Sequence, residues 1–177
     1  MSKHKYFLFN KPIKTLSTLQ NIEGQNTVQN YLSTLNYYSL HLVGRLDYNT
    51  RGALLITTNG VLSYKLMHPS FKVCKKYNVK VKGIPSNSLI NNLKQKNNGI
   101  IILENIGVTK KRNTWFNIEL YTGKPQQIVN IFWGLKVPVI KIIRVSFAKI
   151  NISHLEVGHI RSLTLKEILI LYSQVKI

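Results

Sequence analysis

One aspartate, Asp47, lies in the stretch VGRLDYNTRG (43–52), just before an apolar segment. It is the only aspartate in a chain whose acidic residues number six. A carboxylate can attack a substrate or take a proton only if it is ionised, unshielded and correctly oriented. A tight turn after a strand provides that exposure, and Gly44 and Gly52 permit close backbone approach. The alternative is an ordinary turn aspartate that binds its own backbone.

The charge of the chain indicates a polyanionic partner. Its 25 Lys and Arg against six Asp and Glu give a formal net charge of +19. Such a charge costs a folded domain stability through self-repulsion, whereas Lys and Arg displace the counterions condensed on phosphates. We therefore expect nucleic-acid binding. A compositional drift towards Lys, Asn and Ile is one alternative, but it explains the scarcity of acids less well. A membrane surface is the weaker alternative, since no strongly amphipathic basic helix stands out.

Length and composition favour one globular domain over residues 1–177, with room for two lobes. About 44% of the residues are apolar, which suffices for a core. The single cysteine, Cys74, excludes an internal disulfide. No apolar run approaches membrane-spanning length, and the chain enters strand-like sequence without a leader. We expect a monomer that works in the cytoplasm or an organelle matrix, without a membrane partner.

Apolar periodicity and turn signals outline the elements that must position Asp47. They predict strands at 5–10, 41–47, 52–58, 75–83, 99–109, 114–123 and 138–150, and helices at 26–38, 61–68, 86–96, 126–135 and 164–175. Asn26 is the expected N-cap of the first helix, and Thr164 with Glu167 fits a capping box for the last. Strands outnumber helices and do not alternate with them. The expected fold is therefore α+β, with a mixed, largely antiparallel sheet and flanking helices.

The segment GRLDYNTRGALLITTNG (44–60) resembles the catalytic motif of the pseudouridine synthases that act on ribosomal RNA. FNKPIKTLST (9–18) resembles the entry strand and Lys-Pro turn of that family. The segment 67–83 resembles its His-Pro and Lys-x-Tyr-x-Val-x-Val-x-Gly pattern, and 142–168 resembles its final strand and helix. The resemblance covers nearly the whole catalytic domain. Many relatives carry a small basic RNA-binding domain first, for which this chain has no room.

The resemblance implies a cofactor-free isomerase that converts a uridine of structured RNA to pseudouridine. Asp47 would be the catalytic nucleophile or base, and the target base would be flipped out of the RNA, which costs a few kcal/mol. Arg45 would hold the flipped site open and Tyr77 would stack on the uracil, although Tyr77 also fits an inward-facing core position. Lys75 and Arg144 complete the expected substrate-binding set. No His and Cys spacing indicates a metal site, so none is expected.

One motif departs from the family pattern. The family has an Arg directly after Gln-Val/Ile, which normally pairs with the catalytic aspartate; here the stretch TGKPQQIVNIF (122–132) places Val129 there. An opposite charge beside a carboxylate typically lowers its pKa by about 1–3 units. Either another cation (Lys124, Lys141 or Arg144) or a phosphate-bound conformation replaces the Arg, or the chain is a non-catalytic RNA-binding or ribosome-assembly factor. The retention of Asp47 favours catalysis.

The remaining basic residues are expected to bind RNA phosphates. The strand at 75–83 alternates apolar and basic side chains, and a basic loop joins the next two strands. The expected phosphate-binding residues are Lys76, Lys80, Lys82, Lys110, Lys111, Arg112 and Lys124.

Overall fold

The computed structural model describes residues 4–33, 35, 37, 39–95, 100–110, 112–124 and 126–175. The elements, in chain order, are β1 (Tyr6–Lys11), α1 (Val28–Leu32), β2 (His41–Val43), β3 (Thr50–Thr57), α2 (Gly60–Met67), the short 3-10 helix η1 (Pro69–Phe71), β4 (Lys75–Val81), α3 (Asn87–Gln95), β5 (Ile100–Val108), β6 (Thr114–Leu120), α4 (Gln127–Trp133), β7 (Val139–Phe147), β8 (Ile150–Asn151), β9 (Ile160–Ser162) and α5 (Leu165–Gln174).

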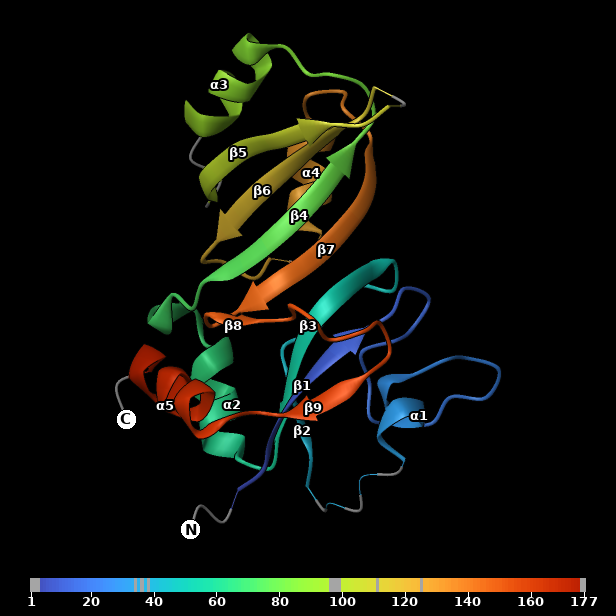
Figure 1. The fold of residues 1–177 in the computed structure, drawn as a ribbon, viewed down its shortest axis with the longest axis vertical. Helices are drawn as coiled ribbons and strands as arrows, with labels where there is room; N and C mark the ends of the chain where they lie inside the picture. Colours follow the sequence, from blue (N-terminus) through green and yellow to red (C-terminus); the bar gives the residue numbers. More distant parts are fainter. Residues whose placement is uncertain are drawn as a thin grey trace.

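The strands form one sheet in the order β5-β6-β4-β7-β3-β1-β9, with β2 beside β3 and β8 beside β7. Every named pair is antiparallel except β3 with β7, which run parallel over three residue pairs, from Thr50–Ile142 to Gly52–Arg144. This short parallel contact joins the upper and lower halves of the sheet in Figure 1. The expected mixed, largely antiparallel sheet with flanking helices is confirmed.

Each half of the sheet has its own core. In the upper half, Val79, Phe116 and Ile118 pack against Phe132 of α4. In the lower half, β1 and β3 bury both faces, one against α2 and α5 and the other against α1. Strands buried on both faces need apolar residues at every position, which explains the unbroken run at 53–56.

Three of the differences between the observed element boundaries and the sequence expectation have a clear local cause. α1 is shorter than the predicted helix 26–38, and its cap is Thr27, whose N–H donates to Asn30 Oδ1 at 2.7 Å. The Ser, Thr, Asn and Tyr residues that follow α1 are poor helix formers. The strand predicted at 41–47 ends at Val43 because Gly44 turns the chain with a φ of +79°. The strand predicted at 138–150 ends at Phe147, where the turn Ala148–Lys149, with both φ values positive, leads into β8.

Among the described helices, none has the length and apolar character needed to cross a membrane.

Candidate active site

A cavity of about 580 Å³ lies where β3 meets β7, and both halves of the sheet line it. From the lower half come the segments 16–18 and 44–48; from the upper half come β4, the end of β6 and the start of α4. The residues that matter most for chemistry are Arg45, Asp47, Lys75, Tyr77, Lys124, Val129 and Arg144. The volume lies in the range of small-ligand sites.

Asp47 lies in a turn that is stabilised by backbone hydrogen bonds, and the Asp47 side chain is exposed. The N–H of Thr50 donates to the carbonyl oxygen of Asp47 at 2.9 Å. Ser17 fixes the preceding residue twice: its hydroxyl donates to Leu46 O at 2.7 Å and accepts from Leu46 N at 3.0 Å. The Asp47 carboxylate has no hydrogen bond or ion pair with any other described residue. It is therefore not the self-capping turn aspartate of the alternative reading, and it lies bare on the cavity wall.

Lys11, the last residue of β1, is a cation whose pKa is affected by Asp47. Its side chain is fully buried, and Nζ donates to the carbonyl oxygens of Pro12 at 2.8 Å and Thr15 at 2.7 Å. Burial lowers the pKa of Lys11 to about 8, attraction by Asp47 raises it, and repulsion by Arg144 lowers it further. Lys11 therefore lies within electrostatic range of both Asp47 and Arg144.

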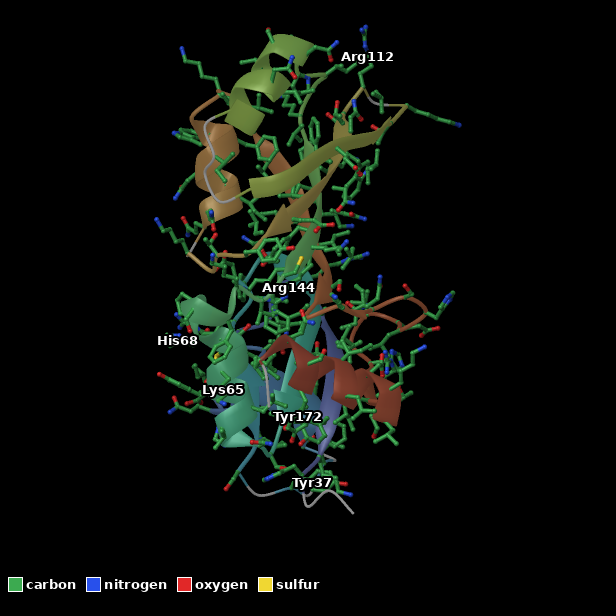
Figure 2. The ribbon with its side chains drawn as sticks, turned by 90° about the vertical axis from the view of Figure 1, so that its left-hand side faces the viewer. Tyr37, Lys65, His68, Arg112, Arg144 and Tyr172 are labelled. Atoms are coloured by element: carbon green, nitrogen blue, oxygen red, sulfur yellow. The ribbon has the colours of Figure 1, made fainter. Side chains whose placement is uncertain are left out.

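Arg144 is the largest fully buried side chain of the described structure, and it lies near the middle of the molecule in Figure 2. Its Nε donates to Ala53 O at 2.7 Å, and its guanidinium carbon is 5.0 Å from the centroid of the Phe147 ring. Its Nη2 is buried and has no acceptor among the described residues. These contacts fix the guanidinium across the junction of β7 and β3.

Lys75 and Tyr77 reach the cavity from one face of β4. Burial lowers the pKa of Lys75 to about 8, and repulsion by Arg144 adds to the shift. Lys75 Nζ is 5.6 Å from the Phe147 ring centroid. Tyr77 is half-buried and also packs against the upper core, so its ring joins that core to the cavity. Arg45 is exposed at the cavity wall.

The other expected phosphate-binding residues are spread over the molecule. Lys124 lines the cavity. Lys76 and Lys80 do not, because the period of two along β4 points them away from Lys75 and Tyr77. Lys76 is also ion-paired with Glu119.

The remaining basic residues lie further away. Lys82 and Lys110 are exposed and absent from the cavity lining. Figure 2 shows Arg112 at the top of the molecule, in the β5–β6 loop and far from Arg144. Lys111 lies outside the described residues.

Val129 does line the cavity, from the first turn of α4. The residue at the position of the family's Arg therefore still lines the cavity, but it carries no charge. Of the three replacements considered from sequence, Lys124 and Arg144 line the cavity. Lys141 does not; its pKa is lowered by burial and by repulsion from Arg51 and Lys80, on the other side of the sheet.

Sequence reasoning missed Lys11 and Ser17 as residues of the site. Neither residue has a signal in the sequence. A lysine between a strand and a proline is common in turns, and a serine in a polar loop is equally common. Among the described residues, no group of three or more His, Cys, Asp or Glu side chains could hold a metal ion.

The comparisons with known proteins agree with this arrangement. Residues 5–132 match the family model described as RNA pseudouridylate synthase. The chain is 32% identical to the ribosomal large subunit pseudouridine synthase B of Bacillus subtilis, covering 92% of this chain and 69% of that protein. It is also 32% identical to the synthase B of Buchnera aphidicola subsp. Baizongia pistaciae, covering 84% of this chain and 62% of the relative.

Solved structures show the same fold. A crystal structure of a pseudouridylate synthase superposes with a TM-score of 0.81 at 23% identity, covering 97% of this chain and 75% of that one. An archaeal H/ACA particle protein in complex with Nop10 superposes with a TM-score of 0.60 at 15% identity, covering 80% of this chain and 47% of that one. The family match spans the strands and turns that carry Asp47 and Tyr77. On these grounds the chain belongs to the RNA pseudouridylate synthase family.

Proposed function

We propose that this protein isomerises a uridine of ribosomal RNA to pseudouridine, with Asp47 as the catalytic carboxylate. The observation that carries the proposal is the bare Asp47 side chain on a cavity that Tyr77 and Arg45 also line. The ribosomal substrate is supported by the names of the two synthase B relatives.

The reaction is balanced within the substrate. The bond from ribose carbon 1′ to uracil nitrogen 1 breaks, a bond from carbon 1′ to uracil carbon 5 forms, the proton on carbon 5 leaves, and nitrogen 1 gains one. Asp47 begins the sequence either by attacking the ribose or by taking a proton from it, and both roles need the ionised acid. The detached uracil must stay in place while it turns. Stacking on Tyr77 provides that hold, at about 1–3 kcal/mol.

The remaining cavity residues serve orientation and charge. Lys11 and Arg144 supply the positive field that the family's Arg supplies elsewhere, since Val129 carries no charge. Arg45 is placed at the exposed rim, where it occupies the space left in the RNA when the base flips out. Lys124 and Lys75 neutralise phosphates beside the target nucleotide.

The test uses ribosomal RNA transcripts in which every uridine carries tritium on carbon 5, because isomerisation releases that hydrogen to water. Wild-type protein should release tritium. Asp47→Asn, which keeps the shape of the side chain, should lower the rate by about 10³-fold or more. Its RNA affinity in a filter-binding assay should stay close to that of the wild type.

The matched control is Glu156→Gln, which neutralises an exposed carboxylate between β8 and β9 that does not line the cavity, and it should leave the release rate unchanged. A wild-type protein that binds these transcripts but releases no tritium would overturn the isomerase proposal and leave an RNA-binding factor on the same fold.

A further inference from the structure

The upper half of the sheet has two faces with different surroundings. One face packs on α4 and opens into the cavity. No described helix covers the other face of β6, β4 and β7, which is turned towards the viewer in Figure 1, while α4 lies behind it. An open face of an antiparallel sheet is ordinarily a mixture of polar side chains. This one has a more specific composition.

Strand register brings six half-buried side chains together on this face. Trp115, Lys80 and Lys141 lie side by side on β6, β4 and β7, and Asn117 and Asn78 form the next row. Arg51 of β3 pairs with Ile143, beside Lys141. We name Arg51, Asn78, Lys80, Trp115, Asn117 and Lys141 the outer sheet face.

The outer sheet face carries three basic residues and no acidic one. Arg51, Lys80 and Lys141 form no ion pair with any described carboxylate. Their mutual repulsion contributes to the lowered pKa of Lys141, after burial. The two acids on this side are Glu119, which is ion-paired with Lys76, and Glu104 on β5, which pairs with Asn117 at the end of the face away from Arg51. Clustered like charges are unfavourable in the free protein, so a bound polyanion would stabilise them.

Two further features fit RNA in particular. The Lys80 ammonium lies 5.9 Å from the centroid of the Trp115 ring, an arrangement that combines a cation with a flat stacking surface. On the same face, Asn117 Oδ1 and Arg51 Nε are buried polar atoms with no partner among the described residues. Single-stranded RNA is typically bound by sheet faces that offer cations for phosphates, rings for bases and amides for base edges.

Neighbouring residues of β7 reach the two sides: Ile142 lines the cavity, and Lys141 belongs to the outer sheet face. β3 pairs with β7 only at Ile142–Arg144, so the edge of β7 at Val139–Lys141 has no neighbouring strand on that side among the described residues. An RNA strand that leaves the cavity can pass round this edge and meets Lys141 first.

We propose that the outer sheet face binds a single-stranded segment of the same RNA whose target uridine enters the cavity. Arg51, Lys80 and Lys141 contact its phosphates and Trp115 stacks on a base. The inference rests on the proposed function only in taking RNA as the substrate. It gives Lys80, which does not reach the cavity, a place in binding.

The test follows the fluorescence of Trp115. The chain has two tryptophans, and Trp133 is 75% exposed on α4, so Trp133→Phe leaves Trp115 as the only reporter. Oligouridylate of about 12 nucleotides should quench it. Lys80→Gln with Lys141→Gln should raise the dissociation constant about tenfold and reduce the slope of log Kd against log salt by about 1.4, the value for two phosphates of a single strand. Lys149→Gln with Lys166→Gln, at two exposed lysines elsewhere, is the charge-matched control and should change neither by as much.

Each outcome decides the matter. Unquenched Trp115, or a Lys80 and Lys141 double variant that behaves as the control pair does, overturns the proposal. Equal quenching by polyglutamate of the same charge assigns the face to an acidic protein and overturns it as well. Restoration of binding by Lys80→Arg with Lys141→Arg supports it.

The two proposals can fail separately. Quenching without tritium release by the wild type would refute the isomerase proposal and support RNA binding by the outer sheet face. Tritium release without quenching would support the isomerase proposal and refute RNA binding by the outer sheet face.

Discussion

The backbone of Gly52 lies directly against the backbone of Arg144. A Cβ atom at position 52 would be 2.2 Å from the carbonyl oxygen of Arg144, and Gly52 has a φ of +122°. These two residues pair at the end of the parallel contact between β3 and β7. Glycine is therefore required where the two halves of the sheet join, five residues after Asp47.

Gly52→Ala should lower the free energy of unfolding by more than about 3 kcal/mol, because the clash is with backbone and cannot be relieved by a rotamer change. Urea denaturation measures the loss. Gly83→Ala is the control, since Gly83 also has a positive φ, +81°, but its added Cβ would meet nothing within 4 Å. It should cost about 1 kcal/mol from the backbone alone. Equal losses at the two positions would contradict the close-packing explanation.

The sequence predicted the sheet well because its strands carry strong local signals. The apolar runs of β1 and β3 and the alternation of β4 each define a strand before any tertiary contact is known. The cap of α5 was also predicted correctly, since Thr164 and Glu167 bind each other's backbone within one turn. α1 was predicted too long, because its limits depend on packing and capping that periodicity does not report.

The site was predicted in part, for a related reason. Asp47 stood out because it is chemically unique in the chain and lies in a long motif. Lys11 belongs to a strand and lies 36 positions before Asp47 in the chain. It comes within electrostatic range of Asp47 only after β1 and β3 pair, and single-sequence patterns contain no such information. The strand period alone divides the β4 lysines between two faces. Identifying the face that lines the cavity required the register of β4 with β6 and β7.

Tyr77 serves both the cavity and the upper core, and two substitutions separate these roles. Tyr77→Phe keeps the ring, so it should retain most of the tritium release and most of the stability. Tyr77→Ala removes the ring and should reduce kcat/KM by an amount corresponding to about 1–3 kcal/mol of lost stacking, together with a loss of thermal stability. If Tyr77→Ala lowers stability while kcat/KM remains unchanged, the ring is a core residue only.

Lys11 gives the rate and the stability opposite dependences on pH. Its pKa in the fold is about 8, below the ordinary lysine value of 10.5, so it is charged below pH 8 and neutral above it. If its charge supports Asp47, the rate should fall as the pH rises through 8. Between pH 8 and 10.5 the unfolded chain retains the Lys11 proton and the folded chain does not, so the free energy of unfolding should rise. Lys75, with a similar pKa, adds to the rise in stability.

Measuring tritium release and urea denaturation from pH 7 to about 10 tests this divergence. Lys11→Arg keeps its charge throughout and should move the fall in rate to higher pH. A rate that falls at the same pH in Lys11→Arg would remove Lys11 as the cause and leave Lys75, or the RNA itself, to explain the profile.

Position 129 offers a direct test of how this chain manages without the family's usual Arg. Lys11→Met should lower the rate of tritium release by about 10²-fold, through lost electrostatic support of Asp47. Adding Val129→Arg should recover part of that rate, because Val129 lines the same cavity and an arginine there returns a positive charge to it. Asn130→Arg is the matched control: it adds the same charge one residue further along α4, at an exposed position that does not line the cavity. Recovery by Val129→Arg alone would show that a positive charge near Asp47 supports the rate, whether it comes from β1 or from α4. Equal recovery by both variants would instead mean that a general increase in positive charge improves RNA binding, and Lys11 would then have no specific role.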